Sequence, residues 1–329
     1  MNKIWNRIRP FGRVLKAIQG FIYDLQRFYK YSGWKIDLCN KSVRNYHSVK
    51  IYHSLEKSLS YKKRNKGSGW TDAYLTLSVI QSAEKSHDIG FHDYLAYERL
   101  TQFIDHNDNI HTEKAESIRK SLNKIKYFKI QEPTPATFTY TLNDYKKGIL
   151  EVPENFFFTR YTLREFKDEL IDEDIIKHAV ELAMKSPSVC NRQPWHIYNI
   201  TDQELKTKAL KYQAGNRGFG EKIPNLIIVT TDLRAYVPGQ EHYQHWIDGG
   251  MFSMSFIMAL HSLGIGSCCL NWSQSPSNDK AFRKLINIHE SHTVSMLIAV
   301  GKPDFENIVC TSKRRPLEEV YTLLNNQED

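Results

Sequence analysis

A proline-containing stretch at residues 131–153 constrains this 329-residue chain most, because it separates two segments of different character. It reads QEPTPATFTYTLNDYKKGILEVP, and its three prolines and several threonines are typical of a linker or of a segment that wraps over a surface. The chain before it reads as predominantly helical, whereas the chain after it alternates between helix and strand patterns. We therefore predict two domains, residues 1–150 and residues 151–329.

The positive charge of the chain is concentrated near its amino-terminal end. Residues 1–70 contain sixteen Lys or Arg and three Asp or Glu, a net +13 in a chain whose total is +8, so the remainder carries −5. This asymmetry predicts an acidic partner for the first segment, which could be a membrane surface, another protein or a nucleic acid. Nucleic acid is the least favoured of the three, because no helix-turn-helix, zinc-finger or RNP-like pattern accompanies the charge.

The first thirty residues have the pattern of a basic amphipathic helix, interrupted by Pro10. Apolar residues recur near helical spacing, with arginines and lysines between them: Ile4, Ile8, Val14, Leu15, Ile18, Ile22, Leu25 and Phe28. One interpretation is a peripheral membrane anchor, aided by aromatic residues such as Trp5, Phe11 and Phe21. The other, which we favour, is a helix that packs on its own protein with its charges in solvent.

Residues 47–130 are predicted to be mainly helical, with helices near 73–85, 92–103 and 113–125. His53 and Glu56 are three residues apart and would share a helix face, which suits either a metal or acid–base site or a hydrogen-bonded structural pair. The structural pair is favoured, because one His and one Glu are too few ligands for a metal. The basic run at Lys62, Lys63, Arg64 and Lys66 is not a Walker motif, because its glycines follow the lysines.

Several classes of protein are disfavoured by the sequence. No run of eighteen apolar residues predicts a membrane-spanning helix, and the amino-terminal residues do not resemble a secretory signal. The five cysteines form no CxxC pair, which argues against a disulfide scaffold and a structural zinc site. We expect a cytoplasmic protein, with or without peripheral membrane attachment, in which the adjacent Cys268 and Cys269 are small buried residues rather than redox partners.

The second segment is predicted to be an α+β domain, a mixed sheet flanked by helices. Strand patterns occur at 196–200, 226–231 and 293–300, a helix is expected from Asp172 to about residue 185, and a long apolar helix follows at 245–263. A strand–GxGxxG–helix unit does not occur in the sequence. A dinucleotide would therefore have to bind in another way than in a Rossmann domain.

Three motifs in this segment carry groups suited to an anionic, aromatic ligand. The run Arg160-Tyr161-Thr162-Leu163-Arg164 spaces two cations four residues apart with a hydroxyl between them. The run Ser186-Pro187-Ser188-Val189-Cys190-Asn191-Arg192-Gln193-Pro194-Trp195-His196 ends a helix and presents short polar groups on a turn. Near the carboxyl end, Gly301-Lys302-Pro303 is followed by Lys313-Arg314-Arg315, whose cations suit a phosphate monoester.

In this order, the three motifs resemble those of the FMN-dependent nitroreductase family, over about half of the chain. The resemblance implies a nitroreductase-like sheet domain that binds FMN, preceded by a mainly helical domain outside the ordinary family fold. It implies that Arg160, Lys313 and Arg315 hold the phosphate and that Arg164 lies near flavin N1 and O2. The remaining FMN contacts that it implies are Tyr161, Thr162, Ser188, Asn191, Gln193 and Asn216.

The resemblance also implies the chemistry: an oxidoreductase that passes hydride from NADH or NADPH through FMN to a small electrophile, such as a nitroaromatic or a quinone, in a ping-pong cycle. No side-chain nucleophile or metal is expected, because the flavin carries the reaction. The family's site commonly lies at a homodimer interface, so a homodimer is expected. The alternative is a catalytically weak flavin-fold scaffold, attached to a membrane or an acidic partner through its basic half.

Two departures from the family pattern affect the acceptor rather than the flavin. Some members have a Pro-x-Glu-Gly turn where this chain has Leu270-Asn271-Trp272-Ser273. A lysine that often follows the family's asparagine by three residues is replaced here by Phe219.

Overall fold

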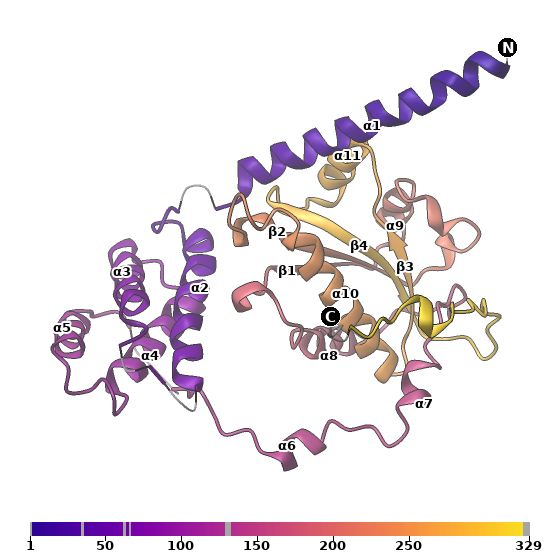
Figure 1. Cartoon of the computed structure of the whole chain (residues 1–329). Coiled ribbons are helices and arrows are strands. Elements are labelled where there is room, and N and C mark those ends of the chain that lie inside the picture. The colour runs from indigo at the N-terminus through magenta and orange to yellow at the C-terminus, as the bar shows by residue number, and fades with distance from the viewer. Residues whose placement is uncertain (1, 34–35, 62–63, 66, 129–132, 325–329) are drawn as a thin grey trace, which may run out of the picture.

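In the computed structural model, the described residues are 2–33, 36–61, 64–65, 67–128 and 133–324, with the side chains of residues 2–11 and 145 left out. The side chains of Ile4, Trp5, Ile8 and Phe11, and the basic residues Lys62, Lys63 and Lys66, therefore lie outside the described part. The chain forms a long amino-terminal helix, a separate helical bundle and a sheet domain covered by helices (Figure 1).

The first helix, α1 (Asn2–Tyr31), continues through Pro10, so the interruption expected there is wrong. It lies against the sheet domain rather than the bundle that follows it in sequence (Figure 1). Tyr23 donates a hydrogen bond to Asp279, Arg27 donates to the backbone oxygens of Glu290 and His292, and Phe28 joins an apolar cluster with Leu233 and Tyr236.

The bundle consists of α2 (Lys41–Ser60), α3 (Trp70–Ser86), α4 (Phe91–Asp105) and α5 (Glu113–Leu122), which share one apolar core. All three helices expected here are present, with ends that differ by a few residues. The His53 Nδ1 and Glu56 Oε2 atoms are 2.9 Å apart, and Arg99 Nε donates to the other Glu56 oxygen at 2.7 Å. The pair is thus part of a structural network between α2 and α4.

A connecting segment leads from the bundle to the sheet domain through two short helices, α6 (Leu142–Lys146) and α7 (Pro153–Phe157). Near its start, the Thr134 oxygen accepts from Arg99, and Ala136 N donates to Gln102. The remainder crosses the open side of the molecule to reach the far end of α10 (Figure 1). Its exposed position and its prolines agree with the wrapping segment expected from the sequence.

The sheet has four antiparallel strands in the order β1-β2-β4-β3: β1 (Trp195–Ile200), β2 (Asn225–Asp232), β4 (His292–Gly301) and β3 (Gly266–Asn271). Every residue of β2 is buried. Because successive side chains of a strand point to opposite faces, both faces of this central strand must be covered.

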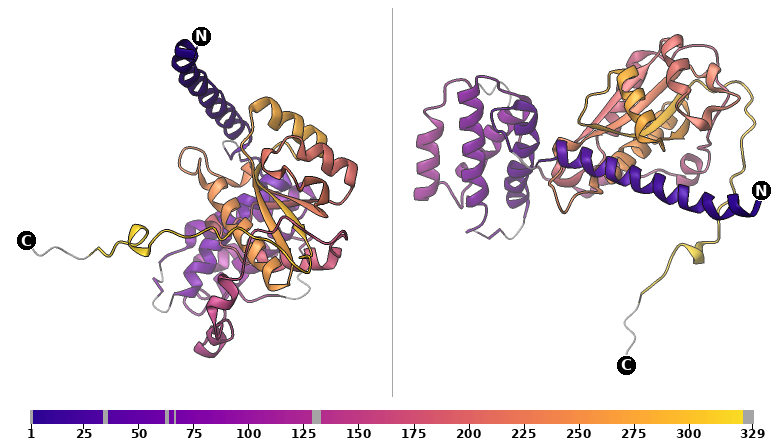
Figure 2. Two further views of the ribbon diagram at one scale, coloured as in Figure 1. Left: turned by 90° about the vertical axis from the view of Figure 1, so that its right-hand side faces the viewer. Right: turned by 90° about the horizontal axis from the view of Figure 1, so that it is seen from above.

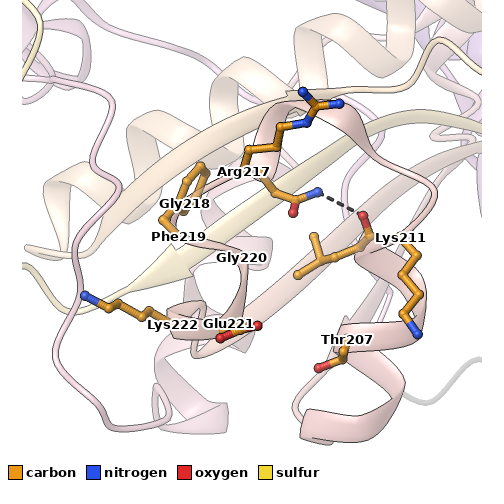
Figure 3. A pocket seen from close by; sticks show the side chains of 10 residues that line it. Thr207, Lys211, Arg217, Gly218, Phe219, Gly220, Glu221 and Lys222 are labelled. Atoms are coloured by element: carbon orange, nitrogen blue, oxygen red, sulfur yellow. Dashed lines mark hydrogen bonds between the residues drawn. The ribbon is translucent and has the colours of Figure 1, made fainter.

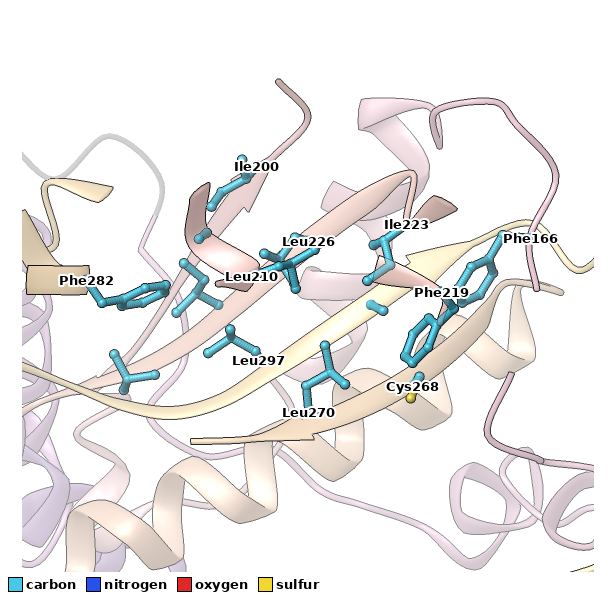
Figure 4. Close-up of a cluster of buried hydrophobic side chains, with 14 of the residues drawn as sticks. Phe166, Ile200, Leu210, Phe219, Ile223, Leu226, Cys268, Leu270, Phe282 and Leu297 are labelled. Atoms are coloured by element: carbon cyan, nitrogen blue, oxygen red, sulfur yellow. The ribbon is translucent and has the colours of Figure 1, made fainter. Parts of the chain in front are cut away.

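Helices cover the two faces of the sheet. On one face, α9 (Gln203–Leu210) and α11 (Pro276–Ile286) contribute Leu210 and Phe282 to a core with Leu226 and Leu297 (Figure 4). On the other face, α8 (Glu173–Ala183) and α10 (Gln244–Ser262) pack on Ile227, Val229, Ile298 and Val300. Short 3-10 turns complete the domain: η1 (Val189–Asn191), η2 (Ala214–Asn216), η3 (Gly220–Lys222), η4 (Leu233–Ala235) and η5 (Leu317–Glu319). The α+β fold expected from the sequence is confirmed.

After β4, the chain leaves its own domain. Within residues 304–324, Cys310–Arg314 pass beside residues 157–164, and the segment then runs outward (Figure 2). Its apolar side chains, such as Phe305, Ile308 and Leu324, are exposed. Among the described residues, no helix is long and apolar enough to cross a membrane.

Candidate functional site

The first and third sequence motifs meet in one pocket of about 480 Å³, which we call the cationic pocket. Its lining consists of Phe157, Phe158, Arg160, Tyr161, Thr162, Arg164, Cys310, Thr311, Ser312, Lys313 and Arg314. Two segments about 150 residues apart in sequence thus place four cationic side chains around one pocket: Arg160, Arg164, Lys313 and Arg314. Arg315, expected to complete the phosphate site, is exposed and lies beyond this lining.

Backbone pairing with the sheet fixes the position of the first motif. Leu163 N donates to Ser267 O of β3 at 3.0 Å, and Thr162 forms a parallel bridge with the same residue. Three residues later, Phe166 bridges to Pro303 just after β4. The motif therefore lies along the β3 edge of the sheet, which holds the Arg160 and Arg164 side chains at one end of the domain.

The two adjacent cysteines lie on β3 beside this pocket. Cys268 is buried and Cys269 is exposed, as expected for neighbours on a strand, whose side chains point to opposite faces. Burial raises the pKa of the Cys268 thiol, and the nearby Arg164 charge offsets only part of that rise. The expectation of small buried residues is met by Cys268 alone, and the opposed directions do not suit a redox pair.

The second motif forms a tight turn between α8 and β1 in an unusual backbone conformation. Cys190, Asn191 and Gln193 have φ angles of 50°, 53° and 52°, in the left-handed region that residues other than glycine seldom adopt. Such a cluster requires compensating contacts from the surrounding structure. Ser188 Oγ accepts from Gln193 N at 3.0 Å, and Gln193 Nε2 donates to Asn191 O at 3.2 Å.

Arg192 supplies the main support of this turn. Its side chain is 1% exposed, and it donates to Ala235 O and, through both terminal nitrogens, to the Glu241 carboxylate at 2.7 and 2.9 Å. Burial raises the pKa of Glu241, but the hydrogen bonds from Arg192 and Val237 N outweigh it and leave that pKa below its usual value. The ion pair thus stays charged and holds the turn with Asn191 facing solvent.

Asp248 of α10 gives the turn a second support. One carboxylate oxygen accepts from Val189 N at 3.4 Å and from Tyr236 Oη at 3.2 Å, and the Asp248 backbone oxygen accepts from Trp195 Nε1 at 3.1 Å. Trp195 also stacks on Phe252. Trp195 is therefore packed beneath the turn.

The bundle reaches this same turn. Helix α2 contacts η1 and η4, and Tyr46 Oη donates to Asp232 Oδ2 at 3.1 Å. Sequence reasoning missed these contacts, as well as Arg192 and Asp248. Arg192 could have been noticed as a charged residue inside the matched motif, but nothing in the sequence indicates that α2 lies against it.

Asn216 lies apart from both groups, in a different hollow lined by Thr207, Lys211, Arg217, Phe219 and Lys222 among others (Figure 3). Its Nδ2 atom donates to Leu210 O at 2.9 Å and to Gln213 O, which occupies both amide hydrogens within its own turn. Phe219 is buried in the core rather than turned into a binding site. In this chain the Asn216 amide nitrogen is a structural group.

Helix α10 extends from the turn to the cationic pocket, so its length gives the distance between them. Asp248, near its start, contacts the turn, whereas His261, near its end, contacts Phe156 O and Thr159 just before the first motif. Thirteen residues of α-helix span roughly 20 Å. One chain therefore presents the two groups of predicted flavin ligands at opposite ends of the same helix. Among the described residues, no group of three or more His, Cys, Asp or Glu could hold a metal ion.

Comparison with known proteins identifies the sheet domain. The model of the nitroreductase family matches residues 158–217 and 210–302. An Archaeoglobus fulgidus protein named "Putative NADH dehydrogenase/NAD(P)H nitroreductase" is 30% identical over 153 residues, which cover 45% of this chain and 84% of that protein. The chain belongs to the nitroreductase family, a family of oxidoreductases.

More distant relatives have different names. The Thermus thermophilus NADH dehydrogenase is 23% identical over 192 residues, covering 49% of this chain and 90% of that protein. The iodotyrosine deiodinase of Nematostella vectensis is 24% identical over 196 residues, covering 50% and 72%. A solved structure described as an FMN-dependent nitroreductase from Clostridium difficile aligns with 51% of this chain and 96% of its own, at 18% identity and a TM-score of 0.44.

Proposed function

We propose that this protein is an FMN-dependent oxidoreductase that takes hydride from NADH or NADPH and passes it to a small electrophilic acceptor. The observation that carries the proposal is the cationic pocket, where two separate motifs converge. The acceptor stays open, because relatives in this family include a protein named as an NADH dehydrogenase and another named as an iodotyrosine deiodinase.

The groups around the cationic pocket fit FMN, the cofactor that the resemblance implies. Arg160 and Lys313 supply positive charge for a phosphate monoester, and Thr162 adds a hydroxyl between them and Arg164. Arg164 would sit beside the flavin ring, where a fixed positive charge favours the reduced, anionic form. When bound, FMN supplies the hydride transfer itself, so the chain's own residues bind, orient and shield it.

A homodimer would complete the site. Because the strained turn lies about 20 Å along α10 from the cationic pocket, Ser188, Asn191 and Gln193 would reach the flavin from the partner copy. A two-fold axis across α10 places the start of one helix against the end of the other, since such an interface brings the same surface together from both copies.

The surface of α10 supports this arrangement. Ile247, Gly250 and Met254 recur at helical spacing and are exposed, with Ile247 50% and Met254 48% accessible. In the proposed dimer, the outward-running carboxyl-terminal segment, with Phe305 and Ile308 fully exposed, would lie on the second copy. Large apolar side chains exposed together, as on α10 and on the carboxyl-terminal segment, are typical of a subunit interface rather than of the surface of an isolated monomer. The five free cysteines suit a reducing compartment, which supports the cytoplasmic location predicted from the sequence.

Subunit mixing tests the shared site. Arg160→Ala removes a cation from the pocket, and Asn191→Gly removes the side chain on the turn while keeping its left-handed backbone accessible. Each variant alone should lose most FMN binding. After the two are unfolded and refolded together, half of the dimers would be mixed and would carry one intact site, so about a quarter of the FMN binding should return.

The control for this experiment is a mixture of Arg160→Ala with Lys313→Ala, both in the same pocket. Every pocket in this mixture carries one of the two substitutions, whichever chains pair, so FMN binding should not recover. A double variant with Arg160→Ala and Asn191→Gly in one chain, mixed with wild type, should also leave mixed dimers without any intact site, so only the quarter of dimers that are purely wild type should bind FMN. Half of the wild-type FMN binding in that mixture, together with no recovery in the first, would contradict the shared site.

A further inference from the structure

Helix α1 is attached to the sheet domain by its polar face. Tyr23, Arg27 and Tyr31, spaced four residues apart, make its hydrogen bonds to Asp279 and to residues 290–292. Residues at this spacing share one side of a helix. The contacts of α1 with the body are with α11 and η4, which lie under this side.

The opposite side of α1 is an apolar stripe that no other described part of the chain covers. Val14, Leu15, Ile18, Phe21, Ile22 and Leu25 are all exposed, Phe21 to 74% and Leu25 to 65%. Leu25 lies two residues from both Tyr23 and Arg27, and at 3.6 residues per turn it therefore points away from the face they form. A helix that only packed on its own protein would bury this stripe.

Charge indicates what covers the stripe. Helix α1 contains seven Lys or Arg and one Asp over thirty residues. Arg13 and Lys16 are exposed. The amino-terminal part of α1 projects beyond the sheet domain (Figures 1 and 2). An apolar face, a basic opposite face and aromatic residues together are typical of helices that lie in the headgroup region of an anionic membrane.

We propose that α1 lies flat on an anionic lipid surface through this stripe and carries the sheet domain on its other side. The geometry allows it, since the stripe faces away from the body along the described length of the helix. A helix of thirty residues would lie along about 45 Å of the surface. The proposal does not depend on flavin chemistry, because none of the residues named for the stripe lines the cationic pocket.

Vesicle flotation with the full-length protein tests this proposal. The protein should float with vesicles of phosphatidylcholine and phosphatidylglycerol in low salt, and much less with phosphatidylcholine alone. Phe21→Gln/Leu25→Gln should weaken binding about tenfold or more, because two large apolar side chains no longer enter the lipid. Arg13→Gln/Lys16→Gln should weaken binding to the anionic vesicles by about tenfold and reduce its salt dependence.

The matched control is Phe91→Gln, which replaces a 70% exposed phenylalanine on α4 of the bundle and should leave vesicle binding unchanged. Near-ultraviolet circular dichroism would establish that each variant is folded. Failure of the folded wild type to float with anionic vesicles in low salt would overturn the proposal, as would equal flotation of Phe21→Gln/Leu25→Gln. Light scattering supplies the other contrary outcome: if wild type does not float and these substitutions lower its oligomeric state, the stripe is covered by a second copy.

Discussion

Single residues decide how the strained turn between α8 and β1 is held. The sequence analysis singled out Asn191 and Gln193 there, yet the side chain between them does the structural work. Arg192 is buried against Glu241 and Ala235 O, and its neighbours take up left-handed backbone angles around it. Comparison with the family motif locates residues 186–196, but only the fold shows that the Arg192 side chain among them points inward.

We predict that Arg192→Met destabilises the protein by about 2–4 kcal/mol, because it leaves the partly buried Glu241 carboxylate without its partner. The same variant should weaken FMN binding, since Asn191 and Gln193 lose their support. Thermal unfolding and flavin titration measure the two effects. Adding Glu241→Gln should restore part of the stability, and a double variant no more stable than Arg192→Met would argue against a lone buried charge as the cause.

His245 provides a pH-dependent contact between α1 and the sheet domain. Its ring stacks on Phe28 of α1 at a centroid distance of 5.9 Å, and burial lowers its pKa to about 4. Between pH 6.5 and about 4, the unfolded chain therefore binds more protons than the folded one. The stability that the neutral ring contributes is complete above pH 6.5 and is lost as the pH falls through this window.

For this residue we expect a loss of about 1–2 kcal/mol between pH 7 and pH 5. His245→Phe keeps an aromatic ring against Phe28 and removes the titration, so its melting temperature should fall less over the same range than that of wild type. His242→Phe, at an exposed position on the same segment, serves as the control. If His245→Phe and wild type lose the same number of degrees, the proton is taken up elsewhere.

At the scale of elements, the predictable parts were those with strong apolar patterns. The strands β2 and β4 and the helix α10 are rich in aliphatic or aromatic residues, and the sequence located all three within one or two residues. Strand β3 was not predicted, because Gly266-Ser267-Cys268-Cys269 follows a glycine turn and has little strand propensity. Helices α9 and α11 were missed as well, since each is short and mostly charged or polar outside one buried edge.

Two adjacent glycines in α10 differ in their surroundings: Gly249 faces the packed sheet, whereas Gly250 faces outward. A methyl group on Gly249 would meet the Ser295 side chain, 2.9 Å from its Cβ, whereas one on Gly250 would meet nothing within 4 Å. We predict that Gly249→Ala destabilises the protein by about 1–3 kcal/mol through overpacking. Gly250→Ala should instead be neutral or stabilising by up to about 1 kcal/mol, because alanine is the better helix former.

A substitution at Gly250 can also distinguish the stability of the monomer from the formation of the dimer. Gly250→Trp adds a large side chain to the exposed surface of α10 that also contains Ile247 and Met254. It should leave the monomer folded but disrupt the proposed dimer and, with it, FMN binding. Denaturant unfolding and light scattering follow the two properties. A Gly250→Trp protein that remains dimeric and keeps its flavin would place the subunit interface elsewhere.

At the scale of the whole molecule, the order of units in sequence differs from their contacts in space. The sequence separated residues 1–150 from residues 151–329, and the bundle of α2 to α5 does have its own core. Helix α1, however, precedes that bundle in sequence and lies on the sheet domain instead. The amphipathic pattern of α1 was visible in the sequence, but the face by which it attaches depends on tertiary contacts from residues 250 positions away.

The candidate site, too, could be predicted from the sequence only in part. The sequence named both groups of predicted flavin ligands through motifs, and the fold gathers Arg160, Thr162, Arg164 and Lys313 around one pocket. It could not be seen from sequence that Ser188, Asn191 and Gln193 would stand at the other end of α10, nor that the Asn216 amide would be used within its own turn. Periodicity and local motifs specify elements, whereas the distance between two motifs is set by the packing of the whole domain.

The most direct test of the central claim is the absorption spectrum of the purified protein, after added FMN and desalting, before and after anaerobic NADH or NADPH. We predict flavin bands that bleach with the donor, and their loss in Arg160→Ala and Lys313→Ala but not in Lys177→Ala, an exposed lysine on α8. Retained bands that neither donor bleaches would favour a scaffold that holds FMN without turnover. A folded protein that stays colourless after incubation with FMN would contradict the account.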